Sequence, residues 1–162
     1  RFMMISRNAD KKIDFDFEIV KSKTKDNPVF YVQYAYARCM SLINIFNQTF
    51  NLNLSNLNID NKKLSRLNLV EEKILIKKLC NFFNIIISAA NNYEPHKLTN
   101  YLFDLAKDFH AYWGVGRLEP SKKIIIQNDL EISKERMILV FGISLIIKKG
   151  MSLLKISCPE SM

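Results

Sequence analysis

Glycine and proline are scarce in this sequence of 162 residues, which contains 4 of each. Both residues interrupt helices and occupy turns, so their scarcity argues against a sandwich or barrel with many short strands. Hydrophobic residues make up 48% and aromatic residues 11% of the chain. This composition is enough to fill the core of one domain of this length. We therefore expect one all-α domain built from long helices with few breaks.

Cysteine and histidine are also sparse, and their spacing does not suit metal or nucleophile chemistry. The 3 Cys, at positions 39, 80 and 158, form no Cys-x-x-Cys pair, and we interpret them as buried small hydrophobic residues in a reducing, cytoplasmic compartment. His96 and His110 lie too far apart on one predicted helix to share a metal, so each is expected on a polar face or at an interface. No phosphate-binding loop or hydrolase motif occurs. We predict no catalytic residue, no metal site and no cofactor site in this chain.

Long apolar runs are missing as well. The longest uncharged apolar stretch, residues 137–147, is shorter than the roughly 20 residues that span a bilayer, so we interpret it as a buried central helix and expect no membrane partner. Acidic residues are outnumbered, with 16 Asp and Glu against 24 Lys and Arg, for a net charge of +8. This excess suits a polyanionic partner, and solubility explains it equally well.

Apolar residues that recur at spacings of three and four predict four long amphipathic helices, over residues 28–51, 69–90, 95–113 and 134–149. Short connections between them favour a helical bundle. The apolar stripe of the second helix consists of Leu75, Leu79, Phe82, Phe83, Ile86 and Ala90.

Glycine and serine positions suggest where these helices begin and end. Gly114 and Gly116 are predicted to end the third helix, Ser133 to cap the fourth and Gly150 to close it.

Shorter features lie between and before these helices. Asp14 is expected to cap a short helix that ends at Val20. Residues 52–68 are interpreted as a loop with at most one helical turn, and residues 124–126 as a short extended piece.

The first long helix carries two different faces. Asn27 followed by Pro28 marks its start, because Asn caps free amides and Pro at the first position loses no hydrogen bond. At about 100° per residue, a core face within about 60° contains Val32, Tyr36, Cys39, Ile43 and Phe50. A second face, about 120° or more from the first, contains Tyr31, Tyr34, Ala35 and Arg38. Phenol rings and a guanidinium that face away from a core suit stacking on bases and binding of phosphate.

Residues 27–38 read Asn-Pro-Val-Phe-Tyr-Val-Gln-Tyr-Ala-Tyr-Ala-Arg. This segment resembles the Asn-Pro-Val-Phe-Tyr-Val-Gln-Tyr-Ala-His-Ala-Arg segment of arginyl-tRNA synthetases, a family of class I aminoacyl-tRNA synthetases. Segments within residues 1–17, 93–113 and 151–162 also resemble that family in order and spacing. The resemblance therefore covers nearly the whole chain.

The resemblance implies an α-helical bundle of four long helices plus short helices, of the class I synthetase anticodon-binding domain type, over residues 27–162. Residues 1–26 would be the tail of the catalytic domain and a linker. The His-Ile-Gly-His and Lys-Met-Ser-Lys signatures of class I synthetases do not occur, so the fragment is expected to be inactive. The parent arginine–tRNA ligase would attach arginine to its tRNA with ATP and magnesium. Its expected partners are the tRNA for arginine and its own catalytic domain, in a monomer.

By the same resemblance, the residues that shape the anticodon-loop pocket correspond here to Tyr31, Tyr34, Arg38, Trp113 and Met162. For Trp113 a role as a core anchor is an equal alternative. The alternative for the whole chain is a helical protein-interaction module in which the same aromatic residues dock another domain or subunit.

Three positions depart from the family pattern. Tyr36 stands where the family usually has His, and it lies on the core face, so we expect repacking rather than lost recognition. Ser161 replaces a frequent Arg, which removes one phosphate or carboxylate contact. Lys155 replaces a frequent Gly, which calls the geometry of the local turn into question.

Overall fold

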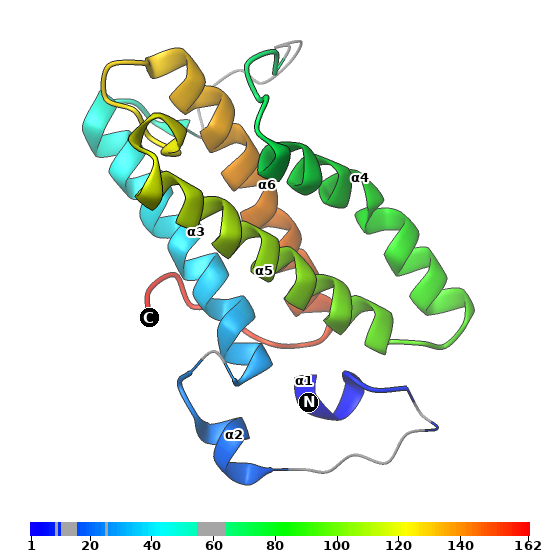
Figure 1. Cartoon of the computed structure of the whole chain (residues 1–162). Helices are drawn as coiled ribbons and strands as arrows, with labels where there is room; N and C mark the ends of the chain where they lie inside the picture. Colours follow the sequence, from blue (N-terminus) through cyan, green and yellow to red (C-terminus); the bar gives the residue numbers. More distant parts are fainter. Residues whose placement is uncertain (9, 11–15, 25, 55–63) are drawn as a thin grey trace.

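The computed structural model describes residues 1–8, 10, 16–24, 26–54 and 64–162. Over these residues the chain is helical and contains no strand, and residues 124–126 belong to no helix or strand. The elements are α1 (Phe2–Ile5), α2 (Phe17–Lys21), α3 (Pro28–Phe50), α4 (Val70–Asn91), α5 (His96–Leu118), the 3-10 helix η2 (Pro120–Lys122) and α6 (Leu130–Leu153). The four long helices α3 to α6 form a bundle (Figure 1), which confirms the predicted fold class.

The core of the bundle forms where α3, α5 and α6 meet. Helix α5 contacts α3, α4 and α6, and α6 also contacts α3 and α4. Met137, Val140, Ile143 and Ile147 of α6 are fully buried. The prediction that residues 137–147 form a buried central helix is therefore confirmed.

The start of α3 follows from one side chain. The Oδ1 atom of Asn27 accepts hydrogen bonds from the amides of Val29 and Phe30, at 3.2 and 3.4 Å. Its Nδ2 atom donates to the carbonyls of Val20 and Ser22, both at 2.9 Å. Asn27 therefore caps α3 as predicted and also ties it to the end of α2. The cap of α2 is Asp16, and the predicted cap Asp14 lies outside the described residues.

Several predicted helix ends are wrong. Helix α5 continues through Gly114 and Gly116 to Leu118, and α6 continues past Gly150 to Leu153. No glycine has a positive φ, so none of them forms a left-handed cap. A Cβ atom on Gly116 would lie 2.9 Å from the Cα of Lys123, and one on Gly150 would lie 2.7 Å from a methyl group of Leu102. These two glycines permit close packing instead of ending helices.

Helix α6 begins earlier than predicted. Its cap is Asp129, which accepts from the amide of Ile132. Ser133 lies inside the helix, where its hydroxyl accepts from the amide of Ile126 at 2.8 Å. Ser133 thus fastens the preceding loop to α6 and does not cap the helix.

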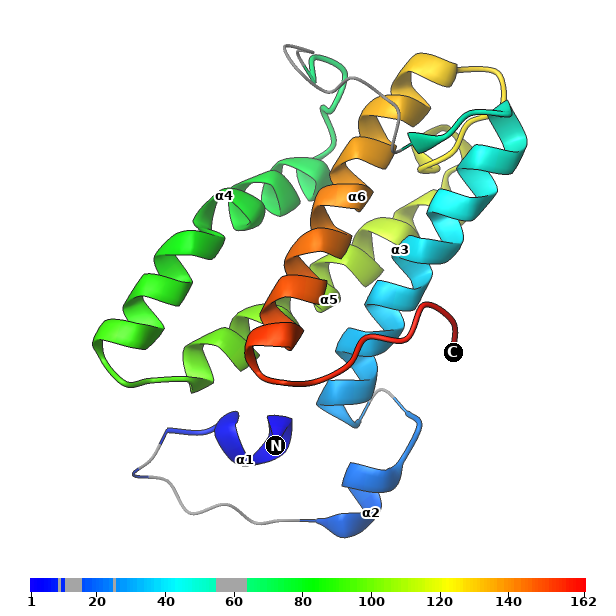
Figure 2. The same cartoon turned by 180° about the vertical axis from the view of Figure 1, so that it is seen from behind.

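Helix α4 lies at the edge of the bundle (Figure 2) and buries only a narrow stripe. Leu75 and Phe82 are buried as predicted, whereas Phe83 is 72% exposed and Ala90 is exposed. Cys80 is also exposed and Cys158 is half-buried, so the prediction that the cysteines are buried is confirmed only for Cys39. By length and composition alone α4 could cross a membrane. It packs along α5 and α6 as a helix of the bundle, and its Glu72 is fully buried in an ion pair with Arg136 of α6.

Residues 1–8 lie against one end of the bundle. Helix α1 contacts α3 and α5, and Phe2 is buried among core residues. The Nη1 atom of Arg1 donates to the carbonyl of Lys155 at 3.0 Å. The amino-terminal segment is therefore packed on the helices that form the candidate site.

Candidate nucleic-acid interface

A cavity of about 610 Å³ opens between α3, the carboxy-terminal half of α5 and the last residues of the chain. Four of the five predicted site residues line it: Tyr34, Arg38, Trp113 and Met162. The other lining residues are Ala37, Ser41, Leu42, Asn44, Ile45, Glu160 and Ser161. Residues that are distant in the sequence thus come together in one concave surface.

Arg38 holds the centre of this surface. Its Nη2 atom donates to the hydroxyl of Tyr34 at 2.6 Å, and its Nη1 atom donates to Nδ1 of His110 at 3.0 Å. The guanidinium lies 3.9 Å from the centroid of the Trp113 ring and 4.5 Å from that of Tyr34. Within the described part of the chain no carboxylate pairs with Arg38. The guanidinium is therefore held in one orientation, and its positive charge is available to an anion or a base.

His110 is a member of this cluster that the sequence interpretation did not assign to it. Arginine can only donate hydrogen bonds, so Nδ1 of His110 must accept from Arg38, and the imidazole carries its proton on Nε2. That Nε2 atom faces the carbonyl of Tyr31 at 3.5 Å. Burial, assisted by the charge of Arg38, lowers the pKa of His110 to about 4. The side chain is thus neutral at pH 7 and serves as a fixed acceptor for Arg38. Its position three residues before Trp113 on one helix face is the signal that would have identified it.

Tyr31 lies apart from the cavity. Its ring packs between α3 and α5, with its centroid 4.6 Å from that of His110 and 5.3 Å from that of Phe103. Burial raises the pKa of its hydroxyl. Ala35, expected on the same exposed face, is fully buried. The exposed face of α3 is therefore narrower than predicted, and a contact between Tyr31 and a ligand stays a prediction.

The carboxy-terminal segment is folded back along α3 (Figure 2), which brings Met162 into the cavity. Lys155 adopts a left-handed conformation with a φ of 56°, so the turn keeps the geometry that favours glycine. Beyond this turn, Nε2 of Gln33 donates to the carbonyl of Ser157 at 2.8 Å. Met162 itself is 52% exposed. The turn at Lys155 and the hydrogen bond from Gln33 thus hold the last residues of the chain against α3, beside the cavity.

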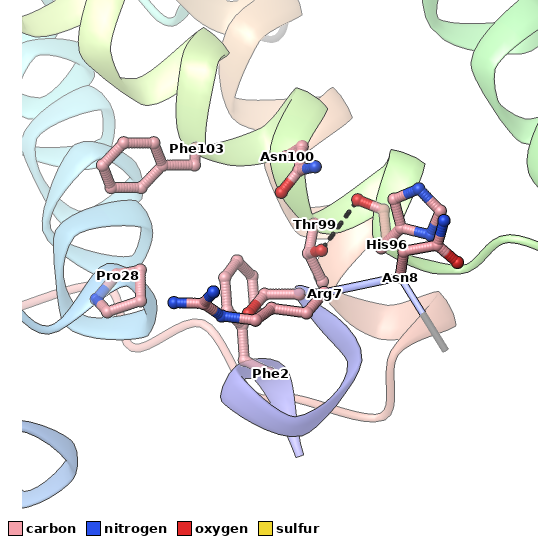
Figure 3. A pocket seen from close by; sticks show the side chains of 9 residues that line it. Phe2, Arg7, Asn8, Pro28, His96, Thr99, Asn100 and Phe103 are labelled. Carbon is pink, nitrogen blue, oxygen red and sulfur yellow. Dashed lines mark hydrogen bonds between the residues drawn. The ribbon is translucent and has the colours of Figure 1, made fainter. Parts of the chain in front are cut away.

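Another large cavity, of about 590 Å³, lies near the start of α3 (Figure 3). It separates α1 from the start of α5, and Phe2, Arg7, His96 and Phe103 are among its lining residues. None of the predicted site residues lines it. Across the described ranges, no group of three or more His, Cys, Asp or Glu is placed to hold a metal ion.

Known proteins resemble this chain in sequence and in fold. A family model described as the DALR anticodon binding domain matches residues 32–162. The chain is 38% identical to an arginine–tRNA ligase of Rhizobium etli over 163 residues, which cover 100% of the chain and 28% of that protein. It is also 38% identical to an arginine–tRNA ligase of Ehrlichia chaffeensis and covers 27% of it. Among solved structures, the arginyl-tRNA synthetase of Thermus thermophilus matches with a TM-score of 0.78 and 29% identity, over 99% of this chain and 25% of that one. The fold is also shared by a protein described as a candidate arginyl-tRNA synthetase from Campylobacter jejuni. That match has a TM-score of 0.80 and 21% identity, and it covers 99% of this chain and 32% of that one.

Proposed function

Because this chain belongs to the DALR anticodon-binding domain family, we propose that it binds the anticodon loop of arginine tRNA as one part of an arginine–tRNA ligase. The chain spans about a quarter to a third of the proteins that it matches. The attachment of arginine to tRNA, a cytoplasmic location and a monomeric parent are therefore proposals about the whole enzyme. The use of ATP and magnesium is likewise a proposal about the whole enzyme.

One observation carries the proposal: the cavity combines an exposed ring, an indole and a cation that pairs with no carboxylate of the described residues. Proteins read single-stranded RNA loops mainly by stacking bases on aromatic side chains and by hydrogen bonds to base edges. Tyr34 supplies a ring, and the guanidinium of Arg38, which lies over the indole of Trp113, supplies a flat face and hydrogen-bond donors. Glu160, also in the lining, supplies an acceptor. An unpaired base in this cavity therefore finds a stacking surface together with both kinds of polar partner.

Replacement of Tyr34 by Ala tests the proposal. Tyr34 is 38% exposed, and stacking on one base is worth about 1–3 kcal/mol, so Tyr34→Ala should raise the Kd for an anticodon stem-loop of arginine tRNA by a factor of about 5 to 150. The measurement is a fluorescence titration of this chain with the labelled stem-loop and with a loop whose central base is changed.

Tyr93→Ala is the matched control, because Tyr93 is 92% exposed on the turn between α4 and α5, away from the cavity. It should leave the Kd unchanged, and circular dichroism should show that both variants are folded. Equal affinity of Tyr34→Ala and the unaltered chain would refute the role of this cavity.

A further inference from the structure

A smaller cavity, of about 230 Å³, adjoins the first and shares Leu42, Ile45 and Trp113 with it. Its other lining residues are Gly116, Arg117, Lys123, Ile124 and Ile125. The indole of Trp113 thus borders both cavities. Arg38 contacts the indole from the first cavity, and the guanidinium of Arg117 lies 5.2 Å from the ring centroid at the second.

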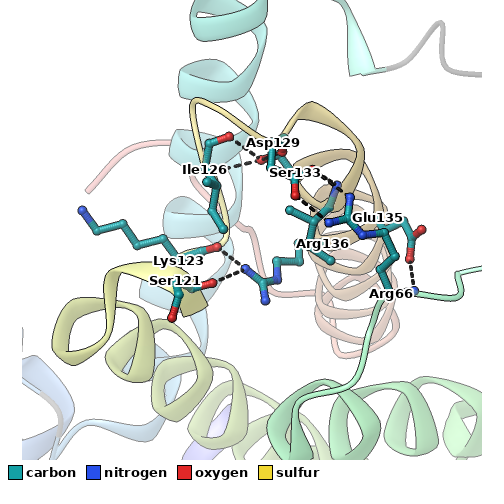
Figure 4. A network of polar contacts seen from close by, with 9 residues as sticks. Arg66, Ser121, Lys123, Ile126, Asp129, Ser133, Glu135 and Arg136 are labelled. Atoms are coloured by element: carbon teal, nitrogen blue, oxygen red, sulfur yellow. Dashed lines mark hydrogen bonds and ion pairs between the residues drawn. The ribbon is translucent and has the colours of Figure 1, made fainter.

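The walls of the second cavity are rigidly built. Gly116 lets the segment at Lys123 lie directly on α5, since a Cβ at this position would come within 2.9 Å of the Lys123 Cα. From beneath, Nη1 of Arg136 donates to the carbonyl of Lys123 at 2.6 Å and to that of Ser121 at 3.3 Å (Figure 4).

Arg136 is itself locked in place. Its Nε atom donates to Oε1 of Glu72 at 2.8 Å, and the hydroxyl of Tyr112 donates to the same oxygen at 3.0 Å. Arg136 is 5% exposed and Glu72 is fully buried. A buried ion pair with satisfied partners therefore fixes the loop that carries Lys123 and Ile125.

The chemistry of the second cavity favours one kind of occupant. Most of its lining side chains are aliphatic or aromatic, which suits the faces of a planar base and offers little to read its edge. Arg117 and Lys123 are exposed, and neither forms an ion pair within the described residues. Apolar walls beside two free cations match a nucleotide, with its base inside and its phosphate on the cations.

We propose that this second cavity binds a further unpaired nucleotide of the same RNA loop, next in the chain to the base bound beside Tyr34, with little preference for base identity. The inference rests on the proposed function, because it needs the first base to lie in the larger cavity. A third hollow, which shares Ile45, Lys123 and Ile125 with the second, continues the surface toward the end of α3. The structure thus offers a path for several consecutive nucleotides.

A double-mutant cycle between protein and RNA tests the inference. The probes are the anticodon stem-loop and a set of stem-loops that each lack one base of the loop but keep its backbone. With the unaltered chain, loss of the base in the second cavity should weaken binding about tenfold. Ile125→Asp, which places a carboxylate in that cavity, should make binding insensitive to loss of that same base.

A second variant avoids changes to a packed wall. Arg117→Ala alters an exposed side chain and should weaken binding severalfold for every loop sequence. The control is Lys73→Ala. Lys73 is an exposed residue of α4 that lines none of these cavities, so its replacement should have no effect. Suppose that Tyr34→Ala weakens binding, Arg117→Ala does not, and Ile125→Asp couples to no loop position. The second site is then refuted and the proposed function stands. If the unaltered chain does not bind the stem-loop at all, both fail.

Discussion

At the residue scale, the site depends on how Arg38 is held. Its Nη1 and Nη2 atoms donate to His110 and Tyr34, and its flat face lies over Trp113. A guanidinium fixed in this way loses little side-chain entropy when a ligand binds. His110 therefore acts as a positioning residue, and it can accept a hydrogen bond from Arg38 only while it is neutral.

The pKa of His110 leads to a prediction about acid stability. In the folded chain this pKa is about 4, below the ordinary value of 6.5. Between these two values the unfolded chain binds a proton that the folded chain does not, so the free energy of unfolding rises with pH across the window and falls on acidification. Urea unfolding at pH 7 and pH 4.5 should show this loss in the unaltered chain.

His110→Gln should show a smaller loss between the same two pH values. The Gln amide does not titrate in this range, and its carbonyl oxygen can still accept from Arg38. If the variant and the unaltered chain lose stability equally, then His110 does not contribute to the acid sensitivity.

At the element scale, α5 shows why glycine alone is a poor guide to helix ends. Gly114 and Gly116 are only two residues apart and both are helical, but their surroundings differ. No atom lies within 4 Å of a Cβ placed on Gly114, whereas the backbone of Lys123 occupies that space at Gly116. The difference arises from a loop that returns to the helix, which no local pattern reveals.

These two glycines give a paired prediction. Gly114→Ala should raise the free energy of unfolding by roughly 0.5–1 kcal/mol, because Ala favours a helix interior. Gly116→Ala should lower it, because the segment at Lys123 must move. Urea unfolding of both variants is the measurement. If both substitutions stabilise the chain, the loop is not held closely against α5.

The elements that could be predicted from sequence are those with local causes. Helix α3 was predicted with its cap and core face because Asn27, Pro28 and the apolar spacing act within the helix itself. The exposure of Phe83 could not be predicted, since it depends on which helices α4 contacts. The start of α6 is not evident from the sequence, because Asp129 caps the helix and the hydroxyl of Ser133 bonds to the preceding loop.

The residues of the candidate site also differ in how far the sequence predicts them. Tyr34 and Arg38 follow from the geometry of one helix, and the family resemblance supplied Trp113 and Met162. That Met162 reaches the cavity depends on the turn at Lys155 and on the hydrogen bond from Gln33. His110, Arg117 and Lys123 belong to the surface through tertiary packing, which the pattern of a single sequence does not reveal.

At the scale of the whole molecule, the net charge of +8 leaves two partners open, a nucleic acid or another protein. The placement of the cations favours the nucleic acid. Arg38, Arg117 and Lys123 follow one another along connected cavities, and none has a carboxylate partner in the described ranges. A protein docked through the apolar walls alone would leave these charges without a role.

Salt dependence separates the two partners. Each phosphate that a cation neutralises on single-stranded RNA contributes about −0.7 to the slope of log Kobs against log salt concentration, so Arg117 and Lys123 together predict a slope of about −1.4. Titrations of the stem-loop at several salt concentrations measure it, and Arg117→Ala should make the slope less steep by about 0.7. A slope near zero would mean that apolar contacts dominate, as expected of a protein-docking surface. A steep slope that Arg117→Ala does not change would place the phosphates elsewhere on the molecule, because only cations in contact with the RNA release its counterions.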